Sequence, residues 1–334
     1  DDRIAMATAC TTLGLPAGKR DRDDILSNPE WNQLAQWLRK RQMRPADLLF
    51  AGDSDLVFDE IDPRIAAKVR AVPDRASTVA LEIEQLEHVG IWTMSRADSG
   101  FPRRWKERLK GAAPAVIFGT GPAELLDRPA VAIVGSREIT EELGELGNSI
   151  GMRVSQAGMV VVSGGARGSD RVGMQGALLD EGCAVGVLPA DLSRLSKQRD
   201  VREFIANGKL CLVTQVNPDA GFSVGNAMAR NRLIYSLSDL AMIIATKAGS
   251  GGTWAGATEN RKKCWVPMAV WTGLDAPDGN FALAEEGVFS FSERPSGPEW
   301  LHRLIESVQA ENPALQSKPS EEQVLQLGLE IADS

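Results

Sequence analysis

Four segments in the middle of the chain are rich in glycine, small hydroxyl side chains or arginine, in different combinations. Glycine lets a ligand approach backbone N–H groups closely, and a guanidinium forms paired hydrogen bonds with phosphate oxygens. An anionic, phosphate-bearing ligand is therefore the chemistry that these residue types favour. The candidate residues are Gly135, Ser136 and Arg137; Ser163, Gly164, Gly165, Arg167 and Gly168; Arg230, Asn231 and Arg232; and Ser250, Gly251, Gly252 and Thr253.

Each segment also has a purely structural explanation. The first could be a plain turn between a strand and a helix, and the arginines near residue 231 could pair with Asp191 or Asp239. A helix start rich in small residues is common without any ligand. Four such loops at one edge of a sheet are more specific than any one of them, so the argument depends on the elements that carry them.

Short apolar runs alternate with amphipathic stretches between residues 115 and 270. This alternation predicts βαβ units and an α/β fold with a Rossmann-like doubly wound, mostly parallel sheet. Ligands of such sheets bind at the carboxyl ends of the strands. The expected strands cover residues 115–118, 130–135, 159–163, 184–188, 210–213, 240–246 and 264–270.

The domain prediction has three parts. Residues 1–96 are expected to form a small all-helical domain with Asn28 as a helix N-cap, and residues 97–290 the extended Rossmann-like domain. Residues 291–334 are expected to form a helix near 298–310 and an acidic tail, since they hold three Lys and Arg against eight Asp and Glu. The net charge of −8 thus does not exclude a local basic face that binds nucleic acid.

Several function classes lose support from the sequence. The four cysteines form no C-x-x-C pair, and the two histidines lie outside the glycine-rich segments, so we expect no metal site and no histidine-based catalysis. The G-G-x-x-G spacing after residue 163 differs from the dinucleotide fingerprint, and a P-loop is missing, so no cofactor is expected. No apolar run approaches the roughly 20 residues of a membrane-spanning helix, which favours a cytoplasmic protein without membrane contact.

The motifs together resemble the DNA-processing protein A family over residues 97–270. The family's G-S-R-x-x-T matches Gly135 to Thr140, its S-G-x-A-x-G-I-D matches Ser163 to Asp170, and its R-N-R matches Arg230 to Arg232. The resemblance implies a positively charged pocket for single-stranded DNA, in which Thr140 would take part, together with a homodimer. It further implies transfer of the DNA to a RecA-type recombinase during transformation, by a binding protein rather than an enzyme.

The chain departs from the family pattern at several positions. Ser169 replaces an isoleucine, Gly173-Met174 replaces the family's A-H, and the segment from Ser250 to Trp254 is shorter than its S-G-[ST]-x-x-T-A counterpart. Asp170 is expected to be a helix N-cap. Trp254 lies beside the last loop and is a candidate for stacking on a base.

Two alternatives share the same loops. The lonely-guy phosphoribohydrolases resemble this chain in Gly251-Gly252-Thr253, and Glu259 would then help to cleave a nucleoside monophosphate. A sensor that binds a small nucleotide without converting it is the second alternative.

Overall fold

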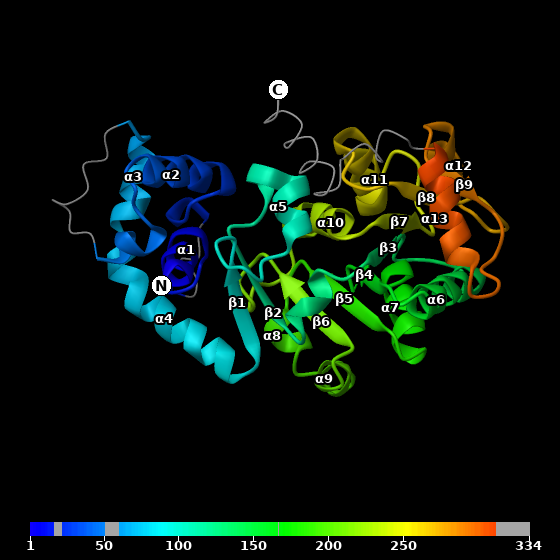
Figure 1. The fold of residues 1–334 in the computed structure, drawn as a ribbon, viewed down its shortest axis with the longest axis horizontal. Helices are drawn as coiled ribbons and strands as arrows, with labels where there is room; N and C mark the ends of the chain where they lie inside the picture. The colour runs from blue at the N-terminus through cyan, green and yellow to red at the C-terminus, as the bar shows by residue number, and fades with distance from the viewer. Residues whose placement is uncertain (17–21, 51–59, 166, 312–334) are drawn as a thin grey trace, which may run out of the picture.

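The computed structural model describes residues 1–16, 22–50, 60–165 and 167–311, and these form one α/β fold around a nine-stranded sheet (Figure 1). The strand order is β1-β2-β6-β5-β4-β3-β7-β8-β9. The strands from β6 through β5, β4, β3, β7 and β8 to β9 run parallel to one another. Strands β1 and β2 are antiparallel additions at one edge. The predicted doubly wound, mostly parallel sheet is thus confirmed. The strands are β1 (Ile91–Ser95), β2 (Val116–Thr120), β3 (Ala130–Val134), β4 (Val160–Ser163), β5 (Cys183–Leu188), β6 (Leu210–Thr214), β7 (Leu240–Ile243), β8 (Met268–Trp271) and β9 (Phe289–Phe291).

Helices cover both faces of the sheet, because alternate residues of its strands point to opposite sides. Val131 and Ile133 belong to the apolar cluster under α6, α7, α9 and α13, whereas Ala132 and Val134 belong to the cluster under α5, α10, α11 and α12. The helices are α1 (Asp2–Cys10), α2 (Asn28–Lys40), α3 (Pro63–Arg70), α4 (Val72–His88), α5 (Arg103–Leu109), α6 (Glu141–Gln156), α7 (Ser169–Leu179), α8 (Leu192–Leu195), α9 (Arg199–Ala206), α10 (Val224–Leu237), α11 (Gly251–Lys263), α12 (Asp278–Glu285) and α13 (Trp300–Glu311).

The N-terminal helices pack beside the antiparallel edge of the sheet (Figure 1). The predicted N-cap at Asn28 is wrong by one residue: Ser27 caps α2, and its side chain and that of Glu30 form a reciprocal capping box. Residues 91–95, which we expected in an all-helical region, form the edge strand β1. Its central residues alternate between buried and half-buried, unlike the continuously apolar inner strands.

The division of the chain into three domains stays a prediction. The helix expected near residues 298–310 is α13, which packs against α6, and the tail at 312–334 lies outside the described residues. No helix in the described part of the chain is long and apolar enough to span a membrane.

The chain reverses its direction across the sheet at β3. Strands β4, β5 and β6 follow on one side of β3, and β7, β8 and β9 on the other. A crevice opens at the carboxyl ends of the strands at such a switch point. Backbone hydrogen bonds fix the loop after β3, since Ser136 N donates to Ala245 O at 2.8 Å and Ser169 N donates to Ser136 O at 3.1 Å.

Gly168 allows the β4–α7 loop to close over this loop. Its φ is +81°, and a Cβ atom there would overlap the carbonyl oxygens of Ser136 and Arg137. We predict that Gly168→Ala lowers the free energy of unfolding by about 2 kcal/mol. Gly144→Ala is the control, because Gly144 lies in α6 with open space around it, and alanine should stabilise that helix slightly. Equal urea denaturation midpoints for the two variants would contradict the prediction.

Candidate functional site

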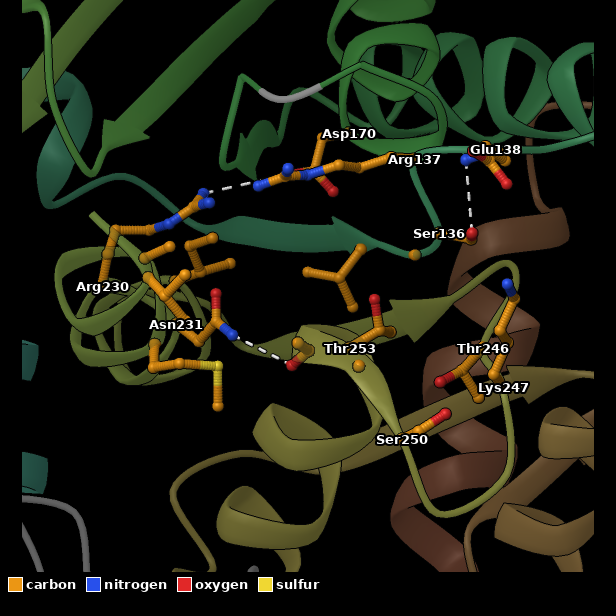
Figure 2. A pocket seen from close by; sticks show the side chains of 18 of the residues that line it. Ser136, Arg137, Glu138, Asp170, Arg230, Asn231, Thr246, Lys247, Ser250 and Thr253 are labelled. Atoms are coloured by element: carbon orange, nitrogen blue, oxygen red, sulfur yellow. Dashed lines mark hydrogen bonds and ion pairs between the residues drawn. The ribbon is translucent and has the colours of Figure 1, made fainter. Parts of the chain in front are cut away.

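A cleft of about 480 Å³ lies at the switch point (Figure 2). We call it the switch-point cleft. Its walls come from the loop after β3, the segment before α10, α10 itself, the loop after β7 and the start of α11. It is therefore built by the parallel-sheet topology and by segments distant in the sequence. The lining residues are Val134, Gly135, Ser136, Arg137, Glu138, Asp170, Phe222, Val224, Ala227, Met228, Arg230, Asn231, Ile234, Tyr235, Thr246, Lys247, Ser250, Gly251, Gly252 and Thr253.

The structure brings about half of the residues singled out from the sequence into this lining. They belong to the loop after β3, to α10 and to the start of α11. The other predicted site residues lie outside the lining, and several of them cap a helix, pack against the core or form hydrogen bonds within the fold. Those within the lining are Gly135, Ser136, Arg137, Arg230, Asn231, Ser250, Gly251, Gly252 and Thr253; those outside are Thr140, Ser163, Gly164, Gly165, Arg167, Gly168, Arg232 and Trp254.

The loop after β4 supports the cleft from behind. Ser163 is fully buried, and its Oγ donates to Ile133 O at 2.6 Å, while Gly164 N donates to Asp170 Oδ2 at 3.1 Å. The predicted N-cap at Asp170 is wrong, because Gly168 is the N-cap of α7 and Asp170 lies within its first turn. Asp170 instead closes the loop and faces α10.

Arg230 is a buried cation at the wall of the cleft. Its Nη1 donates to Val187 O at 3.1 Å and lies 3.8 Å from Asp170 Oδ2; the Arg230 and Asp170 side chains are 6% and 10% exposed (Figure 2). Burial lowers the pKa of Arg230, and the charge of Asp170 opposes that shift. Gly164 is required beside this pair, because a Cβ atom there would overlap the guanidinium. Arg230 therefore joins α10 to β5 and α7.

Arg137 is the exposed arginine of the cleft. Its guanidinium carbon lies 5.4 Å from the centroid of the Phe222 ring, which is 54% exposed. Lys247 is also exposed and lies across the cleft, on the loop after β7 (Figure 2). Arg230 is paired with Asp170, so the charges of these two residues offset each other. Of the other charged lining residues, Arg137 and Lys247 are positive and Glu138 is negative, so the remaining charge of the lining is positive.

The first turn of α11 forms the remaining wall. Ser250 is its N-cap and Gly251 has a φ of +87°, so the helix begins with small residues. The first N–H groups of a helix have no partner within it and favour an anion. Asn231 Nδ2 donates to Gly252 O at 3.0 Å and thereby ties α10 to this turn (Figure 2).

Three residues predicted for the site have other positions. Arg232 lies across α10 from the cleft, because it is two residues after Arg230 and two residues turn a helix by about 200°. Ser223 caps α10, so both arginines lie in the middle of this helix rather than at its start, where we expected them. Trp254 is half-buried against the apolar cluster under α10 and α11, away from the cleft lining. Thr140 is the N-cap of α6, and its side chain accepts from Leu143 N.

Eleven lining residues were not among the predicted site residues, and four of them are instructive. Lys247 directly follows an expected strand, which was the available signal, whereas Phe222 and Met228 carry no motif. Tyr235 was considered from the sequence as a ring that could stack on a base. Tyr235 is buried, its hydroxyl has no hydrogen-bond partner among the described residues, and burial raises its pKa. Glu259, the acid of the phosphoribohydrolase alternative, is not among the lining residues.

Comparison with known proteins agrees with this architecture. The family model for DNA recombination-mediator protein A matches residues 92–287. A DNA processing protein DprA from Streptococcus pneumoniae is 28% identical over 180 residues, which is 52% of this chain and 62% of that protein. The chain spans about half the length of the other curated relatives it matches.

Solved structures of the same kind share the fold. The crystal structure of DNA processing protein A from S. pneumoniae has a TM-score of 0.64 at 20% identity, covering 84% of this chain and 94% of that one. A DNA processing protein A from Helicobacter pylori, whose structure is described as giving insights into its single-stranded DNA binding mode, has a TM-score of 0.53 at 24% identity, covering 66% and 96%. The fold is thus that of a Rossmann-like protein with a cleft at the switch point. The chain belongs to the DNA recombination-mediator protein A family.

The buried Arg230–Asp170 pair gives a stability prediction. Asp170→Ala leaves the Arg230 charge uncompensated and should lower the free energy of unfolding by about 3 kcal/mol, well above the loss of one helix cap. Adding Arg230→Met removes the buried charge and should recover part of this loss. Urea denaturation of both variants measures it, and a double variant no more stable than Asp170→Ala would contradict the paired-charge explanation.

Proposed function

We propose that the protein binds single-stranded DNA in the switch-point cleft. The observation that carries the proposal is the pairing of an accessible cation with an exposed ring, Arg137 beside Phe222, at the carboxyl edge of the sheet. Proteins that bind single strands combine cationic grooves for the backbone with aromatic faces for the bases. Membership of the family and the single-stranded DNA binding mode of the H. pylori protein support the same ligand.

Phosphate binding is assigned to groups that the fold leaves accessible. Arg137 and Lys247 would form ion pairs with successive phosphates, and the first N–H groups of α11 would donate to a phosphate oxygen. Gly135 lets the loop after β3 pack closely, since a Cβ atom there would overlap the Ser169 side chain, and Ser136 Oγ accepts from Glu138 N at 3.3 Å. Arg230 and Asn231 act as positioning residues, because both side chains already bond protein groups.

The choice of a single strand follows from Phe222. A ring can stack on a base only when that base is free of its neighbours, and a duplex offers no such face. Each stacked base contributes on the order of 1–3 kcal/mol. Trp254, our candidate from the sequence, packs against the core instead, and Phe222 takes over this role in the proposal.

The wider roles implied by the family are part of this proposal. They are a homodimer, transfer of the bound strand to a RecA-type recombinase and a cytoplasmic location. Of the two alternatives, phosphoribohydrolase chemistry receives no support from the position of Glu259 outside the cleft lining. A small-nucleotide sensor would use the same phosphate groups, and it would differ by showing no dependence on strand length.

Arg137→Ala should weaken binding of a labelled oligothymidine about tenfold at low salt and should make the slope of log affinity against log salt shallower by about 0.7, because one phosphate contact is lost. Fluorescence anisotropy across a salt series measures both quantities. Arg202→Ala is the control, since Arg202 is exposed on α9 and does not line the cleft. Identical affinities and slopes for the two variants would remove Arg137 from the site.

Phe222→Leu should weaken oligothymidine binding by about 1–3 kcal/mol without changing the salt slope, because stacking involves no counterion release. Phe281→Leu removes an aromatic ring that is 45% exposed on α12, outside the cleft, and should have no effect. A changed slope, or equal losses in both variants, would show that Phe222 does not stack on a base.

A further inference from the structure

A second, smaller cavity adjoins the switch-point cleft on the side of α6 and α12. Its volume is about 350 Å³. It shares Ser136, Glu138, Thr246 and Lys247 with the lining of the switch-point cleft, so the two cavities meet beyond the carboxyl ends of β3 and β7. We call it the side pocket. Its other lining residues are Ile139, Thr140, Leu143, Ala245, Asp275 and Pro277.

Apolar side chains form much of the wall of the side pocket. Leu143 is buried in the first turn of α6, and Ile139 and Pro277 are half-buried on the loops that precede α6 and α12. Proteins that take a base out of its stack hold it between apolar or aromatic side chains and read its Watson–Crick edge with polar ones. The side pocket has a wall of this kind next to a cleft with accessible cations.

Hydrogen bonds fix the shape of this wall. Asn280 of α12 is fully buried, and its Oδ1 accepts from Thr246 N at 2.8 Å while its Nδ2 donates to Ile244 O at 2.8 Å. Gly279 packs against the same loop, because a Cβ atom there would overlap Thr246 O. The start of α12 and the loop after β7 are therefore held together, and the pocket between them is preformed.

The carboxylates of Glu138 and Asp275 are the free acceptors of the side pocket. Both residues are exposed, and neither side chain has a hydrogen bond or an ion pair with another described residue. The hydroxyls of Ser136 and Thr140 already accept hydrogen bonds from backbone N–H groups. An ionised carboxylate accepts hydrogen bonds and donates none, so it favours a ligand edge that is rich in donors.

We propose that the side pocket takes a guanine base of the single strand whose phosphate is bound by Lys247. Guanine has two adjacent donors on its Watson–Crick edge, N1–H and the N2 amine, and these match the two oxygens of one carboxylate. Adenine and cytosine place an acceptor nitrogen beside their amine, and thymine has one donor between two carbonyl oxygens. This inference rests on the proposed binding of single strands and adds a base preference to it.

Charge keeps the sugar-phosphate backbone out of the side pocket. The pocket has two carboxylates and one cation, Lys247, whereas the remaining charge of the switch-point cleft is positive. Phosphates are repelled by the carboxylates, so a base can enter where the backbone cannot. Glu138 and Lys247 lie on the same side of the switch-point cleft, opposite Arg230 (Figure 2). Because Lys247 lines both cavities, a nucleotide whose phosphate binds there has its base at the mouth of the side pocket.

The test compares oligomers of equal length by competition against labelled oligothymidine, measured as fluorescence anisotropy with the intact protein. The repeats are T-T-G, T-T-A, T-T-C and T-T-I, in which I is inosine, with oligothymidine as the reference. We expect T-T-G to bind about fivefold or more tightly than oligothymidine, because two adjacent donors contact a carboxylate. Inosine lacks the N2 amine of guanine, so T-T-I should lose most of this preference.

A double variant localises the preference. Glu138→Gln with Asp275→Asn removes both carboxylates, and asparagine tolerates the φ of +66° at Asp275. The ratio of T-T-G to oligothymidine affinity should fall to about one. The matched control is Glu141→Gln with Asp278→Asn, which removes two exposed carboxylates from the first turns of α6 and α12, outside both linings, and should keep the ratio.

The possible outcomes separate this inference from the function on which it rests. Binding of T-T-G no tighter than that of any other oligomer would overturn the inference and leave the proposed function standing. A ratio retained in the Glu138 and Asp275 variant, or lost equally in the control, would overturn it as well. Failure of the wild type to bind any oligomer at low salt would contradict the proposed function and this inference with it. Thermal unfolding of each variant without DNA verifies that it is folded.

Discussion

The buried pair of Arg230 and Asp170 determines where the binding groups of this protein lie. Removing two charges from water is unfavourable, and the arrangement persists because Val187 O and Gly164 N supply further hydrogen bonds. The pair fixes α10 against β5 and α7. The switch-point cleft uses α10 as one of its walls, so the position of this helix sets the shape of the cleft.

The same constraint distinguishes the paired cation of the cleft from the accessible ones. Arg230 is occupied by protein groups, whereas Arg137 and Lys247 remain accessible on loops that leave neighbouring strands at the switch point. The parallel topology brings these loops together although they are more than a hundred residues apart. Backbone N–H groups of α11 and the ring of Phe222 lie in the same cleft, and the proposal assigns phosphate binding to the former and base stacking to the latter.

The sequence predicts the inner strands well because they are apolar throughout. It misses β9, which has only three residues, and β1, in which buried and half-buried residues alternate. The loop from Gly135 to Arg137 was identified by residue type. Arg230 and Arg232 were treated as one pair, but two residues turn a helix by about 200°, so of the two Arg230 alone lines the switch-point cleft. Phe222 carries no motif, and only the packing before α10 places it beside Arg137.

The central claim is that the switch-point cleft binds single strands in preference to duplexes. Fluorescence anisotropy with a labelled oligothymidine and a duplex of equal length, each at low and at physiological salt, tests it most directly. The account predicts tighter binding of the single strand at both salt concentrations, with affinity falling as salt rises. Equal affinity for the duplex, or no binding of the single strand at low salt, would contradict it.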